Sequence, residues 1–281
     1  KIAVVEAIRA LALKYPGKQR SLMAFLAGAL REEGCFEYKR AIVDSILERL
    51  SDRAITGTFF IVGELARTHP TMVERIAAAG HEVGLHGWVH VPFPELAPDV
   101  LAEHLRRGRG ELEDISGQSV EGVRAPTFSL VPEAHHALDL VLDAGFRYSS
   151  SVLPARSPLF GDPTAPRHAF RWPNGLVELP CPILEWGRIA LPYLGGTYLR
   201  VLPRRIAQLG LRRATSDEIL WLYCHPYDFD SDEPFRPRPE LGRIGTRVMW
   251  VGRRSMFDRV EACLHGRVGR PLCDRARAIT A

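Results

Sequence analysis

From Ile55 onward, the sequence alternates about six times between short buried runs typical of strands and longer amphipathic runs typical of helices. The predicted strands are residues 55–62, 82–85, 120–124, 146–148, 176–179 and 219–224, and the predicted helices between them begin at Pro70, Pro98, Pro132 and Leu202. Strands that alternate with helices form parallel sheets covered by those helices. The pattern therefore predicts an α/β fold, and we expect a β/α barrel.

The chain divides into three parts on this pattern. Residues 1–50 are predicted to be an N-terminal helical segment that can include a first strand at Ile2–Val5, residues 51–265 the barrel, and residues 266–281 a frayed basic tail. Ile2–Leu13 is apolar, but it is too short to span a bilayer and makes a poor secretion signal, so no transmembrane segment is predicted. The five cysteines are widely separated, which favours reduced thiols and a cytoplasmic location.

Three polar side chains stand at the carboxyl ends of different predicted strands: His86, Arg124 and His225. In a β/α barrel these strand ends surround one face, where catalytic groups gather. We therefore expect the three side chains to share a site. The alternative interpretation is that both histidines are structural.

His86 is followed directly by Gly87 and, four positions along, by His90. Glycine permits a tight turn after the strand because it has no Cβ to clash. Two neutral imidazoles brought together by such a turn can bind one divalent ion, and zinc is the ion we expect. For an isolated pair of histidines at this spacing, simple packing would be the preferred interpretation, but the position at a strand end favours a metal site.

These residues resemble motifs of the polysaccharide deacetylase family, also called the NodB-homology or carbohydrate esterase 4 group. His86-Gly-Trp-Val-His90 is similar to its metal-binding motif His-(Ser/Thr)-x-x-His, with Gly87 in place of the hydroxyl residue. Arg124-Ala-Pro126 resembles its Arg-x-Pro groove motif, and the stretch from His225 to Asp230 resembles its late histidine motif. Further matches are Thr58-Phe-Phe60, His81-Glu-Val83 and residues 145–150.

Two more stretches, residues 175–180 and 191–200, resemble a subgroup found in exopolysaccharide gene clusters. The likeness runs from about Ile55 to Leu264. It implies a distorted (β/α)7-type barrel of parallel strands with covering helices, and an active site at the C-terminal strand ends.

The resemblance also implies roles for individual residues. His86 and His90 would hold the metal ion, His225 would stabilise the oxyanion or protonate the leaving amine, and Arg124 would orient the catalytic base. We expect Trp88, Pro126 and Tyr227 to contact the substrate, Trp88 by stacking on a sugar face or else by packing in the protein.

One motif of the family is not found. Family members carry an Asp-Asp pair after the first strand, one Asp acting as base and the other as metal ligand, whereas this chain has no two adjacent aspartates. Of the carboxylates upstream of Ile42, Glu6 is the best candidate because it follows the predicted strand Ile2–Val5. Asp228 is the other candidate, although its expected task is to fix the loop after His225.

Three functions are compatible with these observations. The first is a metal-dependent hydrolase that removes the N-acetyl group from an N-acetylated sugar, in a polysaccharide, a lipid-linked glycan or a nucleotide-sugar. The second is hydrolysis of another C–N bond, in a formamide or a ureido compound. The third is a barrel without catalytic activity that binds glycan or a partner protein. The arginines are scattered singly and in pairs, so nucleic acid is not an expected partner.

Overall fold

The computed structural model describes residues 40–280 except residues 188, 216–217, 240–241 and 267–268. The chain separates into two compact units, residues 1–46 and 47–281. Residues 40–51 are helical, as predicted for this part of the N-terminal segment. The strand predicted at Ile2–Val5 and the candidate carboxylate Glu6 lie outside the described residues.

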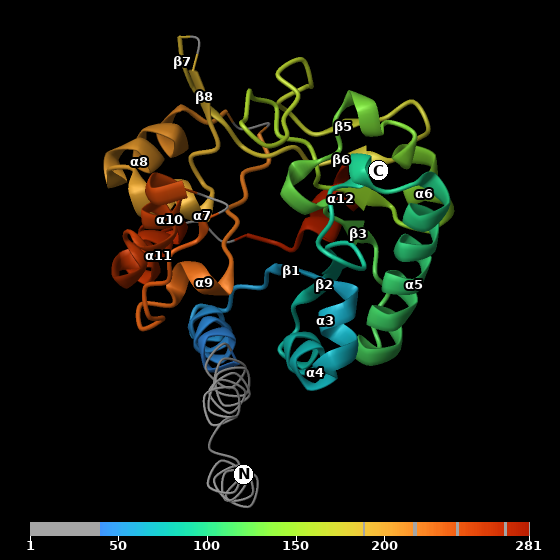
Figure 1. Ribbon diagram of the computed structural model, residues 1–281, viewed down its shortest axis with the longest axis horizontal. Helices are drawn as coiled ribbons and strands as arrows, with labels where there is room; N and C mark the ends of the chain where they lie inside the picture. Colours follow the sequence, from blue (N-terminus) through green and yellow to red (C-terminus); the bar gives the residue numbers. More distant parts are fainter. Residues whose placement is uncertain (1–39, 188, 216–217, 240–241, 267–268, 281) are drawn as a thin grey trace, which may run out of the picture. The chain divides into compact units, whose positions relative to one another are not determined.

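The core of the second unit is a mostly parallel sheet of six strands in the order β1-β2-β3-β4-β6-β5 (Figure 1). The strands are β1 (Thr58–Ile61), β2 (Glu82–Leu85), β3 (Gly122–Val123), β4 (Tyr148–Ser149), β5 (Phe170–Arg171) and β6 (Val177–Glu178). All neighbouring pairs are parallel except β5 with β6. The carboxyl ends of the parallel strands therefore all point to the same end of the sheet. His86 and Arg124 lie at this end, because they directly follow β2 and β3.

Hydrogen bonds between the described strands do not close this sheet into a barrel, because β1 and β5 are its two edges. The predicted α/β class with a mostly parallel sheet is confirmed. The run Ile219–Cys224 is not a strand of the sheet, contrary to prediction. It forms only one isolated bridge, between Tyr223 and Gly195, so its hydrophobic residues pack without a ladder partner.

Four helices cover the sheet strands, and all but the first, α3, were predicted from the sequence. They are α3 (Gly63–Thr68), α4 (Pro70–Ala78), α5 (Pro98–Ser116) and α6 (Ala137–Asp143). Prolines at the starts of α4 and α5 fit the first helical turn, and Gly117 ends α5 in the left-handed conformation with φ 64°. The stripe Leu101, Leu105 and Leu112 of α5 is fully buried, which places this helix against the core.

The second half of this unit is mainly helical, with its own core around Tyr193, Leu199 and Met256. Its elements are the hairpin β7 (Leu184–Trp186) and β8 (Ile189–Leu191), then α7 (Gly196–Val201), α8 (Arg204–Arg213), α9 (Pro226–Phe229), α10 (Gly242–Trp250) and α11 (Met256–Leu264). Among the described residues, none of the helices has the length and apolar character of a membrane span.

The C-terminal tail is not frayed over its whole length, contrary to prediction. Leu272–Thr280 forms helix α12, and Leu272 and Ala276 are buried in a core shared with Tyr148. The backbone N–H of Leu272 donates to Thr58 Oγ1, and that of Cys273 donates to the Glu82 carboxylate. The buried apolar side of α12 and the hydrogen bonds of its first N–H groups therefore fix the tail against the starts of β1 and β2.

Candidate functional site

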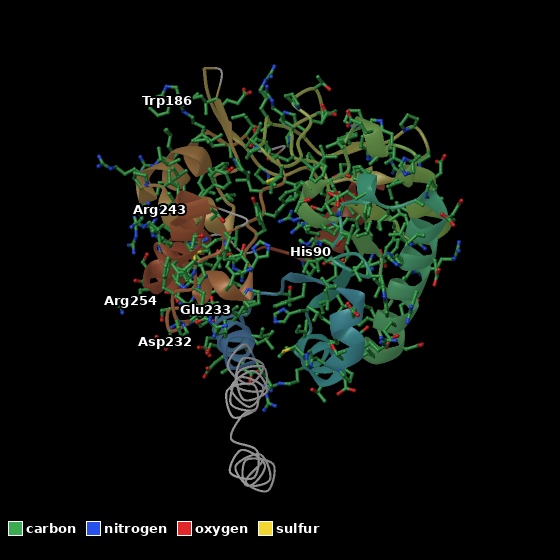
Figure 2. All side chains as sticks on the ribbon, viewed as in Figure 1. His90, Trp186, Asp232, Glu233, Arg243 and Arg254 are labelled. Carbon is green, nitrogen blue, oxygen red and sulfur yellow. The ribbon has the colours of Figure 1, made fainter. Side chains whose placement is uncertain are left out.

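The turn after β2 brings His86 and His90 together. Gly87 has φ +75°, and a Cβ at this position would lie 2.8 Å from the carbonyl oxygen of Val89, so another residue type would strain the turn. The two imidazole rings are edge to face, with 4.9 Å between their centroids. His86 is partly buried and His90, labelled in Figure 2, is exposed.

His86 is oriented by the strand beside it. Its Nδ1 lies 2.8 Å from the carbonyl oxygen of Arg124, an interaction in which the ring can act only as the donor. This arrangement leaves Nε2 unprotonated. Desolvation lowers the pKa of His86 to about 3, assisted by the charges of His90, Arg124 and His225 and opposed by this hydrogen bond, so the ring is neutral at pH 7. Desolvation likewise lowers the pKa of His90.

Arg124 lies between aromatic rings just after β3. Its Nε donates to the carbonyl oxygen of Ser150 and its Nη2 to Ser150 Oγ, at 3.0 and 2.9 Å. Its guanidinium carbon lies 4.2 Å from the ring centroids of both Phe60 and Trp221. Desolvation lowers the pKa of Arg124 to about 10, so the side chain remains cationic. Among the described residues, no carboxylate forms an ion pair with it.

His225 begins the short helix α9, and Asp228 anchors it. The backbone N–H of His225 donates to Asp228 Oδ2 at 2.8 Å, and its Nδ1 lies 3.4 Å from the same oxygen. The Tyr227 ring stacks on the imidazole at 4.8 Å. The His225 side chain is 43% exposed, so it can still reach a ligand. The charge of His225 contributes to the lowered pKa of both His86 and His90.

Asp228, the second candidate carboxylate, is not free to act as a metal ligand or base. It is fully buried and forms an ion pair of 2.6 Å with the equally buried Arg200. Arg200 also donates to the Thr197 hydroxyl and to three carbonyl oxygens, those of Val248, Met249 and Val251. Burial would raise the pKa of Asp228, but hydrogen bonds from His225 and the charges of His225 and Arg200 outweigh it and lower the pKa. Asp228 therefore holds the loop after His225.

Two predicted substrate contacts have other surroundings. Trp88 is only 5% exposed, and the guanidinium of Arg107 lies 3.9 Å from its ring centroid. These surroundings favour the alternative that Trp88 packs in the protein, and contact with a sugar stays a prediction. Pro126 is buried against the Gly87 turn. Tyr227 is the third predicted substrate contact. Its ring stacks on His225.

Sequence reasoning missed Arg200 and Ser150. Arg200 stands in the stretch 191–200 and Ser150 in the stretch 145–150, both of which resemble family motifs. Their presence in those stretches indicated that they matter, but their contact partners cannot be predicted from their positions in the sequence. Arg200 meets Asp228 from 28 positions away, and Ser150 meets Arg124 from 26 positions away.

The described residues fit a divalent metal ion only in part. His86 and His90 provide two neutral imidazoles, and the His86–Arg124 hydrogen bond is the kind of outer contact that fixes metal-binding histidines. However, no group of three histidine, cysteine, aspartate or glutamate side chains is suitably arranged among the described residues. Catalytic zinc sites generally have three protein ligands, so these two histidines form an incomplete ligand set.

Comparison with known proteins identifies two adjoining regions. Residues 33–149 match the family model described as polysaccharide deacetylase, and residues 150–267 match a domain of unknown function, DUF3473. A Mycobacterium smegmatis protein assigned as a polysaccharide deacetylase has a similar fold, with a TM-score of 0.54 and 21% sequence identity, over 87% of this chain and 79% of that one.

A different likeness covers a small part of the chain. Over 52 residues, 18% of this chain, the sequence is 65% identical to coatomer subunit gamma-1 of Oryza sativa subsp. japonica. Over 60 residues it is 58% identical to coatomer subunit gamma-1 of Homo sapiens. The match spans only 6% and 7% of those two proteins.

Proposed function

We propose that the protein is a metal-dependent hydrolase that removes the acetyl group from an N-acetylated sugar, and the match of residues 33–149 to the polysaccharide deacetylase model supports this proposal. The proposal depends chiefly on one observation: the turn after β2 brings the His86 and His90 rings together, with 4.9 Å between their centroids, beside the backbone of Arg124. Zinc is the ion that we expect, and the glycan can be a polymer, a lipid-linked glycan or a nucleotide-sugar.

Each side chain has a task in this reaction. His86 and His90 would hold the ion through neutral imidazole nitrogens, and Nε2 of His86 faces away from its hydrogen bond with Arg124. When bound, a divalent ion supplies Lewis acidity at the acetyl carbonyl and lowers the pKa of water. His225 would donate a proton to the leaving amine, and its Nδ1 lies 3.4 Å from the Asp228 carboxylate, which orients the ring.

The base and the third metal ligand are the missing parts of this mechanism. The family resemblance assigns them to an Asp-Asp pair, and Glu6 is the candidate that this chain offers in its place. Glu6 lies outside the described residues. The resemblance makes Arg124 the residue that would orient the base; in the structure its guanidinium donates to Ser150, and the charge of the buried Glu178 acts on it.

The absence of a carboxylate beside these histidines, among the described residues, favours a second candidate: a family member without catalytic activity that binds glycan.

Zinc titration and amine release together separate the two candidates. We expect the purified protein to bind one zinc ion by calorimetry and to release amine from N-acetylglucosamine oligomers, and we expect His86→Ala to lose both properties. His136→Ala, which changes an exposed histidine of the helical layer, is the control. Equal zinc binding by wild type and His86→Ala would contradict the metal site, and zinc binding without amine release would favour the inactive binder.

A further inference from the structure

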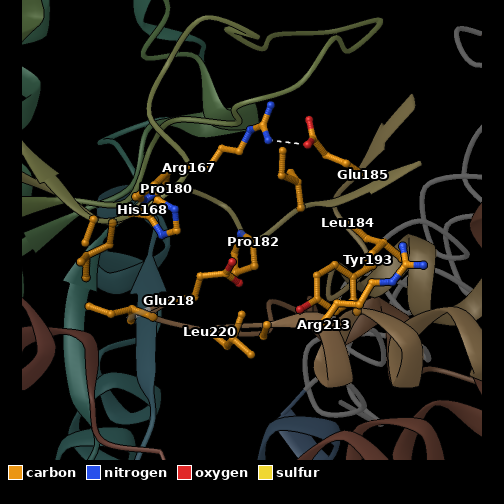
Figure 3. A pocket seen from close by; sticks show the side chains of 16 residues that line it. Arg167, His168, Pro180, Pro182, Leu184, Glu185, Tyr193, Arg213, Glu218 and Leu220 are labelled. Atoms are coloured by element: carbon orange, nitrogen blue, oxygen red, sulfur yellow. Dashed lines mark hydrogen bonds and ion pairs between the residues drawn. The ribbon is translucent and has the colours of Figure 1, made fainter. Parts of the chain in front are cut away.

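A cavity of about 250 Å³ lies apart from the three histidines, none of which lines it (Figure 3). Its walls are Arg167 and His168 before β5, the segment from Leu179 to Glu185 that includes β7, the end of α8, and the residues from Glu218 to Leu220. It is therefore built where the segment leaving the sheet meets the helical half of the unit.

The cavity has charges of both signs. Arg167 forms an ion pair with Glu185, and Figure 3 shows this pair on one side of the cavity. Arg213, from the last turn of α8, and Glu218 also line it, and neither side chain has a polar partner among the described residues. The two guanidinium groups and the two carboxylates balance one another, so this site does not select for a strongly anionic ligand such as a phosphate.

The rest of the lining is apolar or weakly polar. Pro180, Pro182 and Leu220 provide aliphatic surface, and Tyr193 adds an aromatic ring. Aliphatic and aromatic surface beside hydrogen-bonding groups suits a sugar ring, which has C–H faces and hydroxyl groups at its rim. The Glu218 carboxylate and the Arg213 guanidinium could bind hydroxyl groups with charge-assisted hydrogen bonds.

The cavity and the histidine site are joined by continuous chain. Leu220 lines the cavity, and the five residues from it to His225 span at most roughly 18 Å, the limit for an extended chain. On the other wall, Pro180 comes two residues after Glu178, the last residue of β6. This is the same end of the sheet at which His86 follows β2. One glycan chain of several units could therefore occupy both places.

From these observations we propose that the cavity is a second carbohydrate subsite, which binds an uncharged sugar unit of the glycan whose acetylated unit lies at His86 and His90. This proposal rests on the proposed function, and it makes a polymer, not an activated monomer, the expected substrate. The cavity selects for chain length, because only an oligomer that extends past His225 reaches Glu218 and Arg213.

Calorimetric titration of the full chain without added metal, using the hexamer and the dimer of N-acetylglucosamine, tests this proposal. We expect the hexamer to bind at least about tenfold more tightly than the dimer. Glu218→Gln and Arg213→Gln should each weaken hexamer binding by about tenfold, the scale of one lost charge-assisted hydrogen bond, and leave dimer binding unchanged. Arg212→Gln is the matched control, because Arg212 is the exposed neighbour of Arg213 and does not line the cavity.

Equal affinities of wild type for hexamer and dimer, or unchanged hexamer binding in both variants, would overturn the proposal. Should Glu218→Gln fail to fold, as judged by its melting curve, the exposed Arg213 still provides the decisive variant. Binding is measured separately from amine release. Length-dependent binding without amine release would therefore contradict the proposed hydrolase and leave the sugar subsite standing.

Discussion

The two sides of the candidate site differ in their supply of carboxylates. On the sheet side, His86, His90 and Arg124 are held by a backbone carbonyl, by Ser150 and by aromatic rings. On the helical side, His225 is tied to the buried Asp228, which is itself paired with Arg200. Within the described residues, the helical side therefore has a carboxylate bonded to its histidine, whereas on the sheet side the buried Glu178 acts on Arg124 through its charge and no carboxylate pairs with His86 or His90.

This difference shows that the side chains on the two sides of the site are held in place by separate sets of contacts. The Asp228–Arg200 pair belongs to the helical half and does not depend on an acid near β1. On the sheet side, a carboxylate for the proposed metal site would have to come from outside the described residues. Variants on each side should therefore differ in whether they change stability, turnover or neither.

The largest effect on stability is expected on the helical side. Asp228→Asn removes the charge that compensates the fully buried Arg200, and an uncompensated buried charge typically costs about 3 kcal/mol or more. Urea unfolding should show a decrease of that size in the free energy of unfolding. Asp232→Asn, at an exposed aspartate in the next turn, should change it by less than about 0.5 kcal/mol. A decrease of less than about 1 kcal/mol in the free energy of unfolding of Asp228→Asn would contradict this expectation. The buried Asp228–Arg200 ion pair would then not be what stabilises the helical side.

His225→Ala should change turnover without changing metal binding. We expect amine release to fall about 100-fold, the scale of a lost acid–base group, while the zinc stoichiometry stays that of wild type. Steady-state kinetics and zinc calorimetry on the same preparation measure the two quantities, with His136→Ala as the control. Loss of zinc binding in His225→Ala would indicate that His225 is itself a metal ligand, which would contradict its proposed role as proton donor.

The stabilising effect of Asp228 should depend on pH. Its pKa in the folded protein is below its ordinary value of 3.8, so the folded state favours the ionised carboxylate. The stability it contributes is then fully present above pH 3.8 and is lost as pH falls through the lowered pKa. The gap in unfolding free energy between wild type and Asp228→Asn should be constant from pH 5 to 7 and should narrow below about pH 4. A gap that widens on acidification would contradict this sign.

The smallest effect is expected from Arg107 on the sheet side. Arg107→Ala removes the cation over Trp88, which is worth about 0.5–1 kcal/mol at an exposed position. Binding of the N-acetylglucosamine hexamer should not change, because Trp88 is covered by protein. Arg106→Ala, at the exposed neighbouring position, is the control for both measurements. Weaker hexamer binding in Arg107→Ala alone would restore Trp88 as a substrate contact.

The sequence by itself determined the strand–helix alternation and the turn at Gly87. Local patterns are sufficient for these features: Glu82–Leu85 is the observed β2, and the helix predicted from Pro98 is the observed α5, with Gly117 at its end. The family motifs also marked His86, Arg124 and His225 in advance. The run Ile219–Cys224 was misassigned because a hydrophobic run does not reveal whether a ladder partner is available.

Only the tertiary structure decided which side chains meet. Arg200 pairs with Asp228, Ser150 with Arg124, and Arg107 covers Trp88, and in each case the partners come from different elements. The cavity beside Glu218 likewise needs three separated segments. Periodicity encodes which face of an element is buried, whereas contacts between distant elements depend on how those elements pack together, and that arrangement is a property of the whole fold.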